Sequence, residues 1–208
     1  MDYVLVTEGG DDRMLNAPIE WLLEQHCEAP FSGEWANPGA LEDPSRDLSI
    51  RLAQVQRFYP ADLYFVHRDT DTFDRARRLG EINDAVRACG FFKPYVCAIP
   101  VRMTEAWFLF SEPAIRKASG RGQGQVQLRL PTAAEAERRA DPKLILEEKL
   151  VLASELSGRK LAQFRSDMGR RKSLVATGIE DFSPLRQHQS FRSFEADLVA
   201  ALVAGGWA

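Results

Sequence analysis

The fold follows from residues 63–71, which read LYFVHRDTD. The first five residues form an apolar run of the kind that becomes a buried strand, and the charged residues after it suit a loop. A second such run, YVLV at residues 3–6, leads into Thr7-Glu8-Gly9. Apolar residues at helical spacing follow each run, so the sequence predicts parallel strands joined by helices.

Predicted strands and helices alternate as far as residue 101, and only helices are predicted after it. We expect a helix that opens at residues 11–12 and is kinked or restarted at Pro18, a weaker strand at 31–36, a helix at about 46–58, a helix at about 74–89 and a strand at 95–101. Beyond this point only helices are predicted, over residues 105–110, 114–118, 133–139, 142–156 and 194–204. The fold class is therefore α/β, with a Rossmann-like, mostly parallel sheet flanked by helices in residues 1–101 and a helical extension in 102–208 packed on it.

Composition indicates a globular protein. The 208 residues are 45% hydrophobic and 27% charged, which allows a substantial core and argues against disorder. The apolar runs are too short to cross a membrane, and the first residues do not resemble a signal peptide. Cys27, Cys89 and Cys97 form no CxxC pair. We therefore expect a reduced, cytoplasmic protein without a structural zinc site or a membrane partner.

The net charge of −3 conceals an asymmetry along the chain. Residues 1–50 hold eleven acids against two arginines, and residues 159–172 hold six cations against one acid. Either both segments are solvated faces, or a cation site lies beside a surface for a polyanion. The second reading makes Arg170, Arg171 and Lys172 candidates for contacts with a nucleic-acid backbone.

Acidic side chains follow the predicted strands where each strand ends. Glu8 follows the first, Asp69 and Asp71 follow the strand at 63–67, and Glu105 comes soon after the last. The carboxyl ends of parallel strands meet at one edge of a sheet, so these groups are expected to converge there, with Asp12 four residues beyond Glu8. An acid after a strand can also serve as a helix N-cap, but several acids at one edge favour a hard cation such as Mg²⁺ or Mn²⁺.

These motifs resemble a known arrangement. Val4-Leu5-Val6-Thr7-Glu8-Gly9 and Phe65-Val66-His67-Arg68-Asp69-Thr70-Asp71 are similar to the strand motifs of the Toprim domain, which topoisomerases, bacterial primases and the overcoming-lysogenization-defect nucleases share. Met103-Thr104-Glu105-Ala106-Trp107, Asp141-Pro142-Lys143 and Ser190-Phe191-Arg192-Ser193-Phe194 further resemble an uncharacterised bacterial family of Toprim-like proteins. That family is suspected of acting in phage defence, often alongside an ATPase.

The resemblance implies a metal-dependent nuclease. The chain has no room for the tyrosine-bearing domain of a topoisomerase and no zinc-binding cysteine cluster like that of a primase, which leaves hydrolysis as the expected branch. On this reading Asp69 and Asp71 hold Mg²⁺ or Mn²⁺, and Glu8 ligates a second ion or acts as general base. Asp12 and Glu105 complete the second metal or its surroundings.

Several alternatives stay open at this point. Lys143 either neutralises charge on a phosphate or lies on the surface, and His67 is either packed or catalytic. The substrate is DNA or RNA, and the chain acts alone, as a homo-oligomer or with a partner ATPase. The rival function is a non-catalytic interaction or regulatory subunit that keeps the acids as a structural cation site.

Overall fold

Four parallel strands form one sheet in the order β2-β1-β3-β4 in the computed structural model, which describes residues 1–43, 45, 47–70 and 74–208. The strands are β1 (Asp2–Val6), β2 (Ser32–Ala36), β3 (Leu63–His67) and β4 (Tyr95–Ala98). The central strand β1 pairs with β2 on one side and with β3 on the other. The expected parallel sheet is therefore confirmed, with β1 and β3 at its centre.

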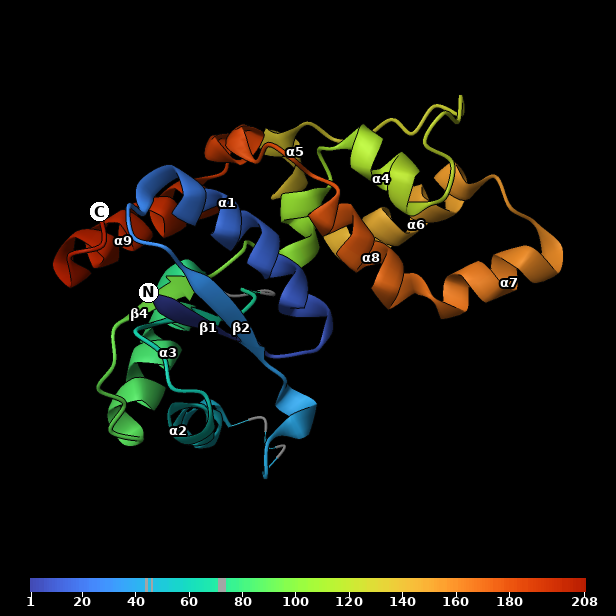
Figure 1. Ribbon diagram of the computed structural model, residues 1–208. Coiled ribbons are helices and arrows are strands. Elements are labelled where there is room, and N and C mark those ends of the chain that lie inside the picture. Colours follow the sequence, from blue (N-terminus) through green and yellow to red (C-terminus); the bar gives the residue numbers. More distant parts are fainter. Residues whose placement is uncertain (44, 46, 71–73) are drawn as a thin grey trace.

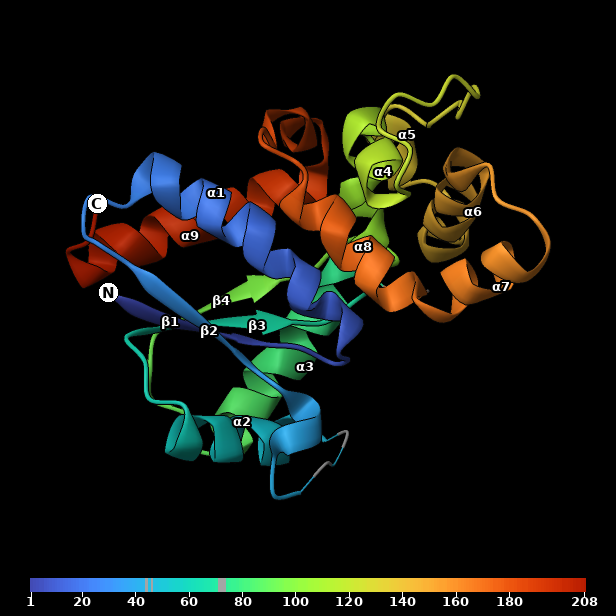
Figure 2. The same cartoon turned by 45° about the vertical axis from the view of Figure 1, so that its right-hand side comes forward.

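The sheet is covered on both faces by helices (Figures 1 and 2). Successive side chains of a strand point to opposite faces, so Tyr3 and Leu5 of β1 enter one core while Val4 and Val6 enter the other. Helices α1 (Asn16–His26) and α9 (Gln189–Gly205) pack on the first face. Helices α2 (Leu48–Phe58) and α3 (Arg75–Ala88) pack on the second. Asp47 and Asp74 cap the last two helices by accepting hydrogen bonds from backbone N–H groups.

The helical half lies to one side of the sheet and then returns to it (Figure 2). Its helices are α4 (Glu112–Ala118), α5 (Ala133–Ala136), α6 (Pro142–Ser154), α7 (Gly158–Ser166) and α8 (Met168–Thr177), followed by α9. Short 3-10 segments are η1 (Asp11–Leu15), η2 (Pro38–Ala40), η3 (Thr104–Phe108) and η4 (Ser183–Gln187). As the Asp-Pro pair predicts, Asp141 caps α6 by accepting a hydrogen bond from the Leu144 N–H at 2.8 Å.

Of the two expectations for Pro18, the structure agrees with a restart and not with a kink: η1 ends at Leu15, α1 begins at Asn16, and Pro18 lies in the first turn of α1, where a residue without an N–H is tolerated. Two other local expectations are corrected. Strand β4 ends at Ala98 and does not continue to residue 101. Helices α7 and α8 fill a segment for which no helix was predicted, since its many charges obscure the apolar spacing.

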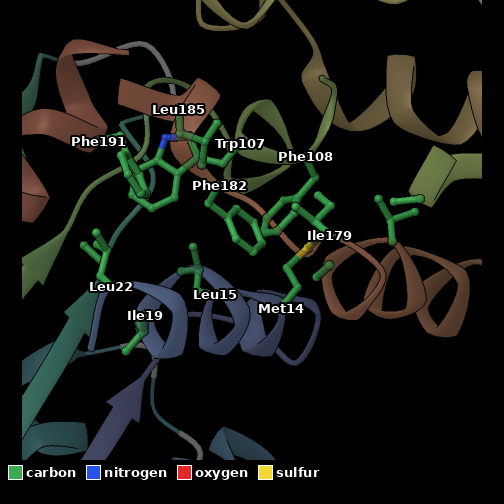
Figure 3. Packing of buried hydrophobic residues seen from close by; sticks show 14 of the residues in the cluster. Met14, Leu15, Ile19, Leu22, Trp107, Phe108, Ile179, Phe182, Leu185 and Phe191 are labelled. Atoms are coloured by element: carbon green, nitrogen blue, oxygen red, sulfur yellow. The ribbon is translucent and has the colours of Figure 1, made fainter. Parts of the chain in front are cut away.

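One hydrophobic core joins the two halves of the chain (Figure 3). Met14 and Leu15 point from η1 toward Ile179 and Phe182 of the helical half. On the sheet, the ring of Phe65 meets that of Phe194 with 5.9 Å between centroids. In the part of the chain that the structure describes, no helix is long and apolar enough to span a membrane.

Candidate metal centre

A cleft of about 570 Å³ opens at the carboxyl ends of β1 and β3. The chain leaves β1 toward β2 on one side and then crosses to β3 on the other, so these two ends flank the point where strand order reverses. The lining contains all the predicted acids that the structure describes, namely Glu8, Asp12, Asp69 and Glu105. Asp71, which was expected to ligate the metal, lies outside the described residues.

Asp12, His67 and Asp69 form a compact group of potential metal ligands at the cleft. One ligand atom from each lies within 4.8 Å of those of the other two. His67 Nε2 is 3.1 Å from Asp69 Oδ1, and His67 Nδ1 is 3.8 Å from Asp12 Oδ2. The imidazole is buried, and the two carboxylates are partly open to the cleft.

Backbone and hydroxyl groups hold this cluster in place. Asp12 Oδ2 accepts a hydrogen bond of 2.9 Å from the Gly9 N–H, in the loop between β1 and η1. The hydroxyl of Thr104, at the start of η3, lies 3.0 Å from His67 Nε2 and 3.1 Å from Asp69 Oδ1. Arg78 Nε donates to the backbone oxygen of Asp69 at 2.7 Å. Four segments therefore fix the position of two carboxylates and one ring.

The carboxylates of the cluster favour a positive charge placed between them. Burial opposes protonation of His67, but the charges of Asp69, Asp12 and Glu105 outweigh it and raise the pKa of the imidazole. Burial raises the pKa of Asp12, and the neighbouring charge of Asp69 adds to this while His67 opposes it. A cation placed among these groups would relieve both the burial cost and the repulsion.

Glu8 lines the same cleft, but its carboxylate pairs with an arginine and not with the Asp12–His67–Asp69 group. Its carboxylate forms an ion pair with Arg68, the residue after β3. Buried Arg51 from α2 donates to the backbone oxygens of Thr7 and Glu8 and so shapes the loop after β1. Glu8 is thus brought near the predicted site but is not part of the Asp12–His67–Asp69 group.

Lys172 requires a correction. It was expected to contact a nucleic-acid backbone from an exposed basic face, but its side chain is only 2% exposed. Its ammonium group lies 2.6 Å from Asp11 Oδ2 and 3.0 Å from Glu105 Oε1. Burial raises the pKa of Glu105, and Lys172 opposes that rise. Glu105, predicted to act in catalysis, is therefore in the cleft and ion-paired.

The other predicted cations have separate locations. Lys143, in the first turn of α6, is exposed and lines the cleft. Arg170 is exposed on α8, whereas the guanidinium of Arg171 packs over the Phe164 ring and donates to the Ala118 oxygen at 2.9 Å. The basic segment is therefore divided among exposed, half-buried and buried positions.

Sequence reasoning missed two groups of this site, since no role was assigned to Thr104 or to Arg51. It left His67 as either packed or catalytic and did not name it as a metal ligand. The signal for His67 was its place two residues before Asp69, since alternate residues of an extended chain face the same side. No protein-family model, curated protein or solved structure matches the chain, so the Toprim resemblance stays a prediction from the strand motifs.

Proposed function

We propose that this protein is a Toprim-like nuclease that hydrolyses phosphodiester bonds of nucleic acid with a divalent cation held by Asp12, His67 and Asp69. The observation that carries the proposal is the convergence of these three groups within 4.8 Å beside a cleft that Asp12 and Asp69 line. The cleft lies at the carboxyl ends of the two central parallel strands, where open α/β sheets bind their ligands.

The residues present fit such a cation. His67 Nδ1 is buried and has no hydrogen-bond partner among the described residues, and it faces Asp12. Its other nitrogen is engaged by Asp69 and Thr104, the arrangement that fixes a metal-binding ring. Two carboxylates suit Mg²⁺ or Mn²⁺, and the imidazole nitrogen favours Mn²⁺ of the two. A bound ion would supply stabilisation of the negative charge that develops on the phosphoryl oxygens.

Side chains around the cluster support the same chemistry. Lys143 and Arg68 place positive charge on the cleft lining, where they would orient a phosphate and offset its charge. Glu8 lines the cleft as a carboxylate that could accept a proton from attacking water, and it is paired with Arg68.

The resemblance to the uncharacterised bacterial Toprim-like family adds a biological role to the proposal. The motifs shared with the uncharacterised bacterial Toprim-like family suggest a role in phage defence, with an ATPase as partner. The exposed cations of residues 159–170 offer a surface for the backbone of a nucleic acid beyond the cleft.

One observation favours a non-catalytic alternative. Glu8 and Glu105, two of the predicted catalytic acids, are already paired with Arg68 and Lys172. If both pairs persist when substrate binds, the cluster would serve only as a structural cation site. The protein would then act as an interaction or regulatory subunit.

The test combines metal binding with cleavage. Single-stranded DNA, double-stranded DNA and RNA are incubated with the protein and Mn²⁺ or Mg²⁺, and Mn²⁺ binding is measured by calorimetry. Asp69→Asn should abolish both Mn²⁺ binding and cleavage. Asp84→Asn, at an exposed acid on α3, should change neither. Metal binding without cleavage of any of the three substrates would favour the structural alternative, and absence of metal binding would contradict both.

A further inference from the structure

The ammonium group of Lys172 is enclosed by three carboxylates. Asp11 Oδ2 is 2.6 Å from Nζ, Glu105 Oε1 is 3.0 Å away and Glu147 Oε1 is 3.8 Å away. These acids come from η1, η3 and α6, and the lysine comes from α8. A buried ammonium is costly unless it is paired, so this enclosure accounts for a lysine with only 2% exposure.

This cluster adjoins the candidate metal centre. Asp11 precedes Asp12 in the chain, and Glu105 follows Thr104, whose hydroxyl contacts His67 and Asp69. Asp11 and Glu105 both line the cleft beside Asp12 and Asp69. Asp11 and Glu105 thus surround an ammonium, whereas their neighbours Asp12 and Asp69 flank the His67 ring.

Helix α8 approaches Asp11 closely enough to keep the ammonium in place. A Cβ atom at Gly169, one turn before Lys172, would lie 3.0 Å from Asp11 Oδ1, which is tighter than an ordinary contact. Glycine at this position therefore permits the short Nζ–Oδ2 distance. The backbone of Lys172 is held in α8, and its ammonium group is held by the carboxylates of Asp11 and Glu105.

We propose that the Lys172 ammonium occupies the place of a second cation, so that the cleft binds one divalent ion and not two. This inference rests on the metal site proposed at Asp12, His67 and Asp69. Asp11 and Glu105 have their charge offset by Lys172, and a second divalent ion on the same oxygens would be repelled by the ammonium. Lys172 is thus a positioning residue that sets the number of metal ions.

The experiment counts bound Mn²⁺ by electron paramagnetic resonance and calorimetry. The wild type should bind one ion per chain. Lys172→Met keeps the length of the side chain and removes its charge, and it should bind two. The double variant Lys172→Met/Glu105→Gln should return to one ion, because a carboxylate of the vacated position is gone. Arg170→Met, two residues earlier on the exposed face, should stay at one.

A second measurement does not depend on folding of a lysine variant. Asp11→Asn should leave the affinity for Mn²⁺ within about twofold of wild type, whereas Asp12→Asn should weaken it by at least about 100-fold. Equal losses in the two variants would make Asp11 a metal ligand and overturn the inference.

The outcomes separate the two proposals. Two ions in the wild type, or one ion in a folded Lys172→Met, would overturn the role of Lys172 and leave the proposed metal site standing. No bound Mn²⁺ in the wild type would overturn the metal site and the inference together.

Discussion

The hydroxyl of Thr104 lies 3.1 Å from Asp69 Oδ1, which links the segment after β4 to the segment after β3. The same hydroxyl is 3.0 Å from His67 Nε2, and that nitrogen is itself 3.1 Å from Asp69 Oδ1. The Thr104 hydroxyl and the Asp69 carboxylate thus fix the orientation of the ring. Because Nε2 is engaged, Nδ1 is the nitrogen left to face Asp12.

Thr104→Val should weaken Mn²⁺ binding by about 10- to 100-fold, the usual effect of removing a group that orients a metal ligand. The contact between the His67 ring and Asp69 remains in this variant, so the variant should still fold. Calorimetric titration measures the affinity, with Thr177→Val on the exposed end of α8 as the control. An unchanged affinity in Thr104→Val would show that the hydroxyl does not orient the site.

Mn²⁺ affinity should rise with pH because His67 must lose its proton to bind the ion. The pKa of His67 is raised above its ordinary value of 6.5, so in the metal-free protein protonation stabilises the fold below pH 6.5. That contribution is lost as pH rises through the raised pKa. The melting temperature without metal should therefore fall over this range, while metal binding strengthens. His67→Asn should flatten both dependences, and a pH-independent Mn²⁺ affinity in the wild type would contradict this account.

Lys143→Gln should weaken nucleic-acid binding without altering Mn²⁺ affinity. Its ammonium lines the cleft, and loss of one phosphate contact reduces the slope of log affinity against log salt by about 0.7 to 0.9. Fluorescence anisotropy with a labelled oligonucleotide at several salt concentrations measures this. Lys117→Gln, at an exposed lysine of α4 outside the cleft lining, should leave the slope unchanged. An equal effect of the two variants would show only a change in overall charge.

Phe194→Ala should lower the free energy of unfolding by about 3 to 5 kcal/mol, as for other buried aromatic residues. The Phe194 side chain is buried in α9 between Phe65 of β3 and Trp107 of η3. Urea unfolding measures the loss, and Phe92→Ala, at a side chain 76% exposed, should have little effect. A small loss in Phe194→Ala would mean that α9 contributes little to the sheet core.

Glu195→Gln should reduce stability at neutral pH by about 1 kcal/mol and should matter less in acid. Arg186 donates hydrogen bonds to Glu195 and, together with His26, holds the pKa of that carboxyl below its ordinary value of 4.5. A depressed pKa contributes stability above the unfolded value, and this is lost as pH falls through the folded one. Urea unfolding at neutral and acidic pH should therefore show the variant and wild type converging in acid. Glu180→Gln, at an exposed acid, serves as the control.

The sheet could be predicted from local patterns, because each strand is a short apolar run with its own boundaries. The run at 63–67 matches β3 at both ends, and the acids after β1 and β3 meet as parallel pairing requires. Topology alone places the carboxyl ends of parallel strands at one edge of the sheet. The presence of Glu8, Asp12 and Asp69 in one cleft could therefore be predicted without knowledge of side-chain packing.

The partners of these acids could not be predicted in the same way. Lys172 reads as one cation in a basic run, and its pairing with Asp11 spans 161 positions of the chain. A partial signal existed, since Lys172 precedes Val175 and Ala176 by three and four residues and shares their buried face of α8. The orienting role of Thr104 likewise depends on how closely η3 approaches β3, which no local pattern specifies.

Packing of α9 against β3 has a consequence for how the protein is made. Ribosomal synthesis releases β1 and β3 long before Phe194, so the apolar face formed by Phe65 stays uncovered while more than half of the chain is still to come. Asp11 must also wait for Lys172 before its charge is offset. Until then the apolar face around Phe65 is the kind of uncovered surface that favours aggregation. The cleft and the ion pair beside it are therefore complete only after residues 143 and 172 have been synthesised.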